Sequence, residues 1–182
     1  MLSQTDFNSG LLVRYGIRYD INDISTDSSS SIILDKLNPS VGLSYKVNSN
    51  DNIFFSFGTS FETPTLNELS NNPNGEGLNE DLKSSTSLNY EIGWRKSVSN
   101  LTLEAIAYVI SSENEILPYE LEQFPGKNFY QNVGSTSRYG LELNSQLSFK
   151  GGSINLSYTL SKNKFEDFLQ PLPKFTVYHA LN

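Results

Sequence analysis

The chain has 182 residues, a net charge of −7, one histidine (His179) and no cysteine. This composition excludes disulfides and thiolate or histidine-rich metal sites, and a net negative charge does not suit a nucleic-acid partner. A transmembrane β-barrel remains compatible with 37% hydrophobic residues, because only every second residue of its strands must be apolar.

Apolar and polar residues alternate along most of the chain. In 11–21, for example, Leu11, Val13 and Tyr15 alternate with Arg14 and Gly16. A period of two predicts strands with one apolar and one polar face. Phe54 breaks the polar side of its segment, and the second half of 101–110 is apolar on both sides. Seven strands are predicted, at 11–21, 41–47, 53–61, 87–95, 101–110, 138–149 and 153–160, and 174–182 has the pattern of the start of an eighth.

The connections between these segments alternate in length. Short turns are predicted at 48–51, at 97–100 and at Gly151-Gly152, and long polar loops at 22–36, about 63–85, 112–131 and 162–173. An up-and-down order places every long loop at one end, as in outer-membrane barrels. We therefore expect an all-β fold, an antiparallel up-and-down transmembrane β-barrel segment of about seven to eight strands.

Aromatic residues on the apolar side lie near strand ends. Tyr45, Phe55, Trp94 and Phe149 are near short turns, and Tyr19, Phe61, Tyr139 and Tyr158 are near long loops. Two such belts are typical of strands that cross a lipid bilayer. The alternative is the general preference of strands for aromatic residues.

Four segments resemble motifs of the TonB-dependent receptors, which are large outer-membrane importers. NPSVGLSYKV (38–47) is similar to the family's strand before the first of the other three. FETPTLNEL (61–69) is similar to the family's aromatic–x–x–Pro–x–x–x–Glu–Leu segment, and LNEDLKSSTSLNYEIGW (78–94) to a block that ends in Glu–x–Gly. NVGSTSRYGLEL (132–143) is similar to its Asn–x–Gly and Gly–x–Glu strand entry. Ser84-Ser85 replaces the family's Pro–Glu pair. The resemblance covers roughly 38–160, and its matching residues are Phe61, Pro64, Glu68, Leu69, Leu82, Glu91, Gly93, Asn132, Gly134, Gly140 and Glu142.

Several of these residues also have a physical interpretation. Pro64 lacks an N–H group and should end its strand at the rim of the barrel, and Glu68 and Leu69 would begin a turn over that rim. The inward-facing Gly93 and Gly140 leave room for a plug domain, or provide a bend for curvature, and both interpretations stay open.

Two acidic residues of these motifs face the polar side. We expect Glu91 and Glu142 to pair with Arg95 and Arg138 within the wall, and a role in holding a plug is the alternative.

The resemblance implies the function of a receptor in the bacterial outer membrane. Such a receptor binds a scarce nutrient, most often a ferric siderophore, and imports it with energy from the inner-membrane TonB complex. Its other partners are outer-membrane lipid and its own plug domain. We expect residues 1–182 to be part of the barrel domain, with the plug domain, signal peptide and final strand absent.

Other functions are less compatible with the residues. No catalytic triad, phosphate loop or dinucleotide motif is present, so no enzyme activity is expected. The acidic loops match no calcium-loop spacing, and no metal or cofactor is expected. Two alternatives stay open, a complete eight-stranded outer-membrane barrel with a structural or adhesion role and a soluble lipocalin-like binder.

Overall fold

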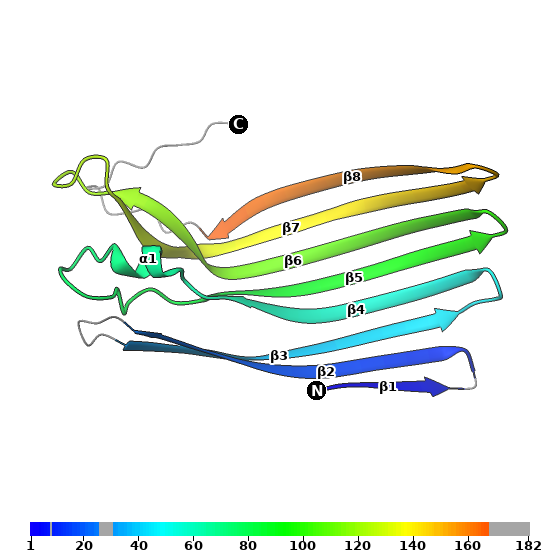
Figure 1. Cartoon of the computed structure of the whole chain (residues 1–182), viewed down its shortest axis with the longest axis horizontal. Helices are drawn as coiled ribbons and strands as arrows, with labels where there is room; N and C mark the ends of the chain where they lie inside the picture. Colours follow the sequence, from blue (N-terminus) through cyan, green and yellow to red (C-terminus); the bar gives the residue numbers. More distant parts are fainter. Residues whose placement is uncertain (8, 26–30, 168–182) are drawn as a thin grey trace.

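The chain forms one antiparallel sheet with the strand order β1 to β8 (Figure 1). The computed structural model describes residues 1–7, 9–25 and 31–167. This architecture confirms the expected all-β, up-and-down fold. The elements are β1 (Leu2–Phe7), β2 (Leu11–Ser25), β3 (Ser31–Lys46), β4 (Asp51–Glu62), α1 (Leu66–Ser70), β5 (Ser85–Val98), β6 (Leu101–Glu120), β7 (Asn128–Phe149) and β8 (Gly152–Asp167).

Short turns lie at one end of the sheet, and α1 and the tip of the β6–β7 hairpin lie at the other (Figure 1). In the turn between β3 and β4, the Asn48 side chain accepts hydrogen bonds from the backbone N–H groups of Asn50 and Asp51. Between β7 and β8, Gly151 has a φ of 100°, which a residue with a side chain rarely adopts. The predicted short turns therefore lie together at one end of the sheet, and the long connection after β4 lies at the other.

The strands are longer than predicted, and two of the predicted long loops are wrong. β2 runs to Ser25 and β3 starts at Ser31, so most of the expected loop 22–36 is strand. β6 and β7 pair as far as Glu120 and Asn128, inside the expected loop 112–131. Regular alternation is lost in these extensions, while the backbone ladder continues.

The eighth strand is not the one predicted. β1 precedes the first predicted strand and pairs with β2 from Leu2 opposite Gly16 to Phe7 opposite Leu11. The expected strand 174–182 lies outside the described residues. β8 continues to Asp167, so the first part of the predicted loop 162–173 is strand.

The register aligns side chains of one kind across the whole sheet. One row of paired residues is apolar in β2 to β8, and the next row is mainly polar or glycine. The sheet therefore has one continuous apolar face and one face of mixed polar, glycine and aromatic residues. The apolar row is Val13, Leu43, Phe55, Ile92, Ala107, Leu141 and Leu160, and the adjacent row is Arg14, Gly42, Ser56, Glu91, Tyr108, Gly140 and Ser161.

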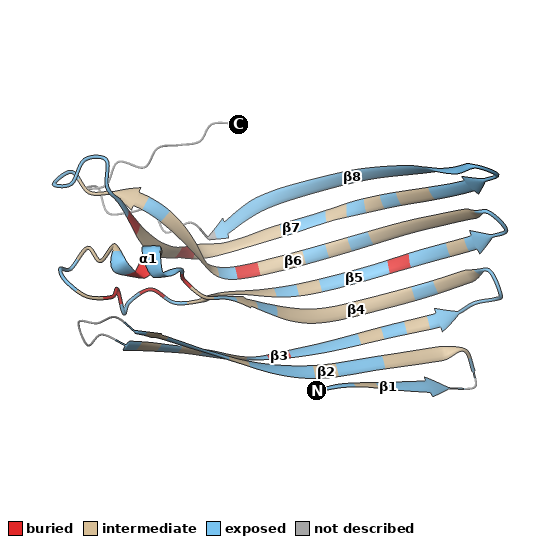
Figure 2. Ribbon diagram, viewed as in Figure 1, coloured by how far each residue is buried: buried red, intermediate tan, exposed pale blue. Residues whose placement is uncertain are grey.

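Burial is concentrated at the long-loop end. Figure 2 shows buried residues around α1 and the loop that follows it, whereas the strands are mostly exposed or half-buried. Large apolar side chains such as Ile92 and Leu156 are 56% and 67% exposed. An apolar face of this extent requires a covering, which lipid provides for a barrel wall.

The sheet is open. Within the described ranges, β1 pairs only with β2 and β8 only with β7. This topology does not agree with the alternative of a closed eight-stranded barrel, in which the first and last strands would pair. Along the described chain, no helix is long and apolar enough to cross a membrane.

Candidate functional site

The segment after β4 is a compact, capped turn. β4 ends at Glu62, and Pro64 is fully buried two residues later. Thr65 caps α1, because its Oγ1 accepts from the Glu68 N–H at 3.3 Å and the Glu68 side chain accepts from the Thr65 N–H at 2.7 Å. This capping box explains why a helix of only five residues forms here.

The loop 63–84 has an apolar core of its own. Leu69, Leu78 and Leu82 are 0%, 4% and 3% exposed and pack together. They contact four residues whose positions in β2, β3, β6 and β7 place them on the same side of the sheet as the polar residues, namely Ile24, Ile32, Ile116 and Tyr130. The polar face thus becomes apolar at the long-loop end, and the loop packs against it there.

Asn132 joins this loop to the β6–β7 hairpin. Its Oδ1 accepts from the Lys83 N–H, and its Nδ2 donates to the Lys83 carbonyl, both at 2.7 Å. Nδ2 also donates to the Asn114 carbonyl at 2.7 Å. Asn114 has a φ of 58° and lies opposite Gly134, between the pairs Glu113–Ser135 and Glu115–Val133.

Beside α1, the polar face forms a cavity of about 580 Å³. Glu68 lines it from α1, Thr63 lines it from the segment before α1, and residues of β4 to β8 line the remainder. Its charged residues have both signs, namely Glu62, Glu68, Glu115, Arg138 and Lys164. Four of them bond to neighbours, since Glu68 accepts from the Thr65 N–H, Glu115 accepts from Thr136, Arg138 donates to Asn163 and Lys164 pairs with Glu166.

The motif residues in the middle of the strands lie in one block. Glu91 and Gly140 are on the same row on either side of Tyr108, and Gly93 and Glu142 are two rows away, on the same face, on either side of Ile106. Two motifs that are far apart in the sequence therefore meet on the polar face. Of the remaining motif residues, Phe61 lies on the apolar face of β4 opposite Thr86.

The predicted ion pairs of Glu91 and Glu142 are wrong. Arg95 instead binds Glu104 on the neighbouring strand, with an Nε–Oε2 distance of 2.7 Å. Glu91 accepts from the Ser56 hydroxyl at 3.1 Å, and Arg138 donates to Asn163 at 2.9 Å. The physical reason is reach, because residues four apart on a strand are about 13 Å apart and a cross-strand neighbour is much closer.

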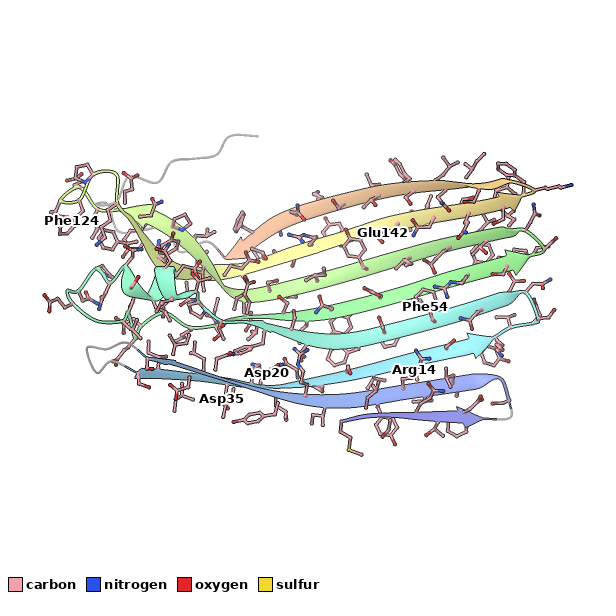
Figure 3. The ribbon with its side chains drawn as sticks, viewed as in Figure 1. Arg14, Asp20, Asp35, Phe54, Phe124 and Glu142 are labelled. Atoms are coloured by element: carbon pink, nitrogen blue, oxygen red, sulfur yellow. The ribbon has the colours of Figure 1, made fainter. Side chains whose placement is uncertain are left out.

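Aromatic rings fill the space above both motif glycines. The ring of Phe54, which is labelled in Figure 3, lies where a Cβ at Gly93 would be. The Arg95 guanidinium lies over this ring, 5.7 Å from its centroid. A Cβ at Gly140 would meet the Tyr108 ring and the Leu160 carbonyl. This space is occupied from within the wall, and the broken polar alternation at Phe54 was the sequence signal for it.

The aromatic residues of the β6–β7 hairpin pack mainly on one another. Phe129 is 1% exposed, with ring centroids of Tyr119 and Phe124 at 6.0 and 5.7 Å and the Lys127 amine at 5.0 Å. Burial raises the pKa of Tyr119 above its usual value. Phe124 is 50% exposed at the hairpin tip (Figure 3). In the part of the chain that the structure describes, no three His, Cys, Asp or Glu side chains are grouped as metal ligands.

Comparison with protein families gives a match along nearly the whole chain. Residues 3–178 match the model described as "TonB dependent receptor-like, beta-barrel". The chain belongs to the TonB-dependent receptor family. It is therefore a β-barrel protein of the bacterial outer membrane.

Individual relatives of this TonB-dependent receptor chain share short or distant similarity. The vitamin B12 transporter BtuB of Vibrio vulnificus is 32% identical over 106 residues, which are 57% of this chain and 15% of that protein. The F3-3 variant of the FrpB iron transporter from Neisseria meningitidis has a TM-score of 0.74 at 17% identity, over 97% of this chain and 26% of that one.

A third similar structure is a mutant of the ferric enterobactin receptor PfeA from Pseudomonas aeruginosa. Its TM-score is 0.63 at 20% identity, and the match covers 86% of this chain and 25% of that one. The TonB-dependent receptor chain thus spans about a quarter of these two solved structures and less of the curated relative. These relatives are named as transporters or receptors, not as enzymes.

Proposed function

We propose that the chain forms part of the barrel wall of a receptor that binds a ferric siderophore and imports it through the outer membrane. The energy comes from the inner-membrane TonB complex, which acts through the receptor's plug domain. The chain itself has no catalytic role. The observation that carries this proposal is the family match over residues 3–178.

The two faces of the sheet support a role as a wall. The apolar face suits outer-membrane lipid, and the opposite face with its mixed-charge cavity suits a wet lumen. Two of the named relatives transport or receive iron compounds, which favours a ferric siderophore over vitamin B12. The coverage of about a quarter of those structures supports a barrel whose other strands and plug lie elsewhere in the receptor.

Uptake by cells that carry or lack the full-length gene tests this proposal. Under iron limitation, we expect the deletion strain to lose uptake of at least one radiolabelled ferric siderophore and to regain it with the intact gene. Dissipating the inner-membrane proton gradient should abolish the same uptake.

Two results would contradict the proposal. If the deletion strain keeps its uptake of every ferric siderophore in a panel but loses uptake of vitamin B12, the substrate is vitamin B12 and not a ferric siderophore. Unchanged uptake of every nutrient, with no binding by the purified receptor, would exclude the transport function.

A further inference from the structure

The side chain of Asn132 binds the loop 63–84 as a neighbouring strand would. It contacts both backbone polar groups of Lys83 at 2.7 Å, although 49 residues separate the two. An asparagine side chain carries one acceptor and two donors, and here the acceptor and both donor bonds are used, the second of them on Asn114. Aspartate, leucine and alanine cannot make this set of bonds.

The Asn114 backbone is shaped for this contact. Its φ of 58° is a left-handed conformation that asparagine tolerates better than most residues. The carbonyl that Asn132 binds belongs to this residue, which faces Gly134 in β7. In the Asn–x–Gly segment, Asn132 thus supplies the side-chain amide, and Gly134 is the residue of β7 opposite the left-handed backbone of Asn114.

The loop is fixed at a second place, near α1. The Asn79 N–H donates to the Leu69 carbonyl at 2.7 Å, and Asn79 is 5% exposed. The Asn72 side chain donates to the Leu78 carbonyl, and the Asn79 side chain accepts from the Asp81 N–H. Together with the leucine core, these bonds leave Lys83 as the point where the loop returns to the sheet.

The fixed loop also forms one side of the mixed-charge cavity. Glu68 from α1 lines that cavity opposite residues of β6, β7 and β8. Displacement of the loop would move Glu68 and open this side of the cavity.

We propose that Asn132 is a positioning residue that holds the loop 63–84 as a fixed strap over the polar face and thereby sets the shape of the cavity. The strap itself depends only on the described contacts. Its effect on nutrient binding rests on the proposed import function.

Limited trypsin cleavage of the purified full-length receptor in detergent tests the strap. Lys83 has an exposed side chain, but its backbone groups are bound by Asn132, so trypsin should cut after it slowly. In Asn132→Ala and Asn132→Asp we expect cleavage at Lys83 to be roughly tenfold faster or more, because the loop opens more often. Mass spectrometry of the fragments gives the rates, and cleavage at Lys127 in the same sample is the internal reference.

Asn144→Ala is the matched control variant. Asn144 is on the same strand and the same face but contacts neither the loop nor Lys83. Unheated gel mobility shows that each variant is folded. An unchanged Lys83-to-Lys127 ratio in folded Asn132→Ala, or an equal rise in Asn144→Ala, would overturn the strap.

Nutrient binding by the same variants tests the effect on the cavity. With the nutrient that the wild-type receptor takes up, Asn132→Ala should raise the half-saturation concentration severalfold without changing maximal uptake, while Asn144→Ala changes neither. If Asn132→Ala is cleaved faster at Lys83 but its half-saturation concentration is unchanged, the effect on the cavity is refuted and the strap is retained. Absence of uptake by the wild-type receptor would refute the import function, and the cleavage ratio would still decide the strap.

Discussion

At the scale of single residues, two glycines of the polar face differ in what surrounds them. Gly93 faces the end of the Phe54 ring, which is a side chain that rotates away at moderate cost. Gly140 faces both the Tyr108 ring and the Leu160 carbonyl, and the carbonyl belongs to the backbone of the next strand. The same substitution should therefore have different consequences at the two sites.

Gly93→Ala should destabilise the barrel by about 1–3 kcal/mol because its methyl group displaces the Phe54 ring. The double variant with Phe54→Ala should recover most of this loss relative to Phe54→Ala alone. Gly140→Ala should cost more, and Tyr108→Ala should not restore it, because the Leu160 carbonyl remains. Denaturant unfolding of the full-length receptor in detergent measures each free energy.

Gly58→Ala serves as the control for these glycines. Gly58 is on the same face, and a Cβ there would meet only the Ser40 Cβ at an ordinary 3.9 Å. Equal losses at positions 58 and 93, or a lack of coupling between positions 54 and 93, would contradict this account.

At the scale of elements, the loop 63–84 has a stability of its own. Leu69 is fully buried in α1, whereas Leu66 in the same helix is 55% exposed. Because both are leucines in the same short helix, replacing each by alanine changes helix propensity about equally. A difference between the two variants therefore measures the packing of Leu69.

Leu69→Ala should lower the opening free energy of the loop by about 2–5 kcal/mol, whereas Leu66→Ala should change it little. Hydrogen exchange detected by mass spectrometry checks this at the Asn79 N–H, which donates to the Leu69 carbonyl. If the two leucine variants exchange alike at Asn79, the leucine core does not hold the loop.

Sequence alternation predicted the element types well, but it failed at strand ends. It located all the strands from β2 to β8 because their central residues have one face that lipid must cover. It missed β1, which is short, and it missed the extensions of β2, β3, β6, β7 and β8, where regular alternation is lost. Ile24 and Ile32 lie on the otherwise polar face. Alternation along their own strands could not predict them, because they pack against leucines of a loop that is distant in the sequence.

The candidate site was predicted only as a set of motif residues. Pro64 does follow the end of β4, but the helix at Glu68 and Leu69 was expected only as a turn. The bond from Asn132 to Lys83 and the rings over Gly93 and Gly140 depend on cross-strand register. A single sequence fixes the face of each residue but not its neighbour on the next strand.

At the scale of the whole molecule, the exposed apolar face suits the lipid-facing side of the proposed barrel wall. Leu141 lies in the apolar row that crosses from β2 to β8 and is 39% exposed. Asn144 lies three residues further along β7 on the opposite face.

Leu141→Arg should therefore destabilise the folded receptor by about 2–4 kcal/mol, because it places a charge among lipid chains. Asn144→Arg should be nearly neutral, since its side chain faces the wet side. Folding of the full-length receptor into lipid vesicles, followed by denaturant titration, measures both. Equal tolerance of arginine at the two positions would contradict the assignment of the faces.

The β6–β7 hairpin ends in a tip at 121–127, at the same end of the sheet as the loop 63–84 (Figure 1). The tip is held by its own bonds, from the Phe124 N–H to the Leu121 carbonyl and from the Lys127 N–H to the Phe124 carbonyl. A side chain at Gly126 would meet no atom within 4 Å, but the φ of 81° at this position favours glycine. Other exposed residues of this tip can change in evolution, or receive an inserted epitope, with little effect on the wall below them.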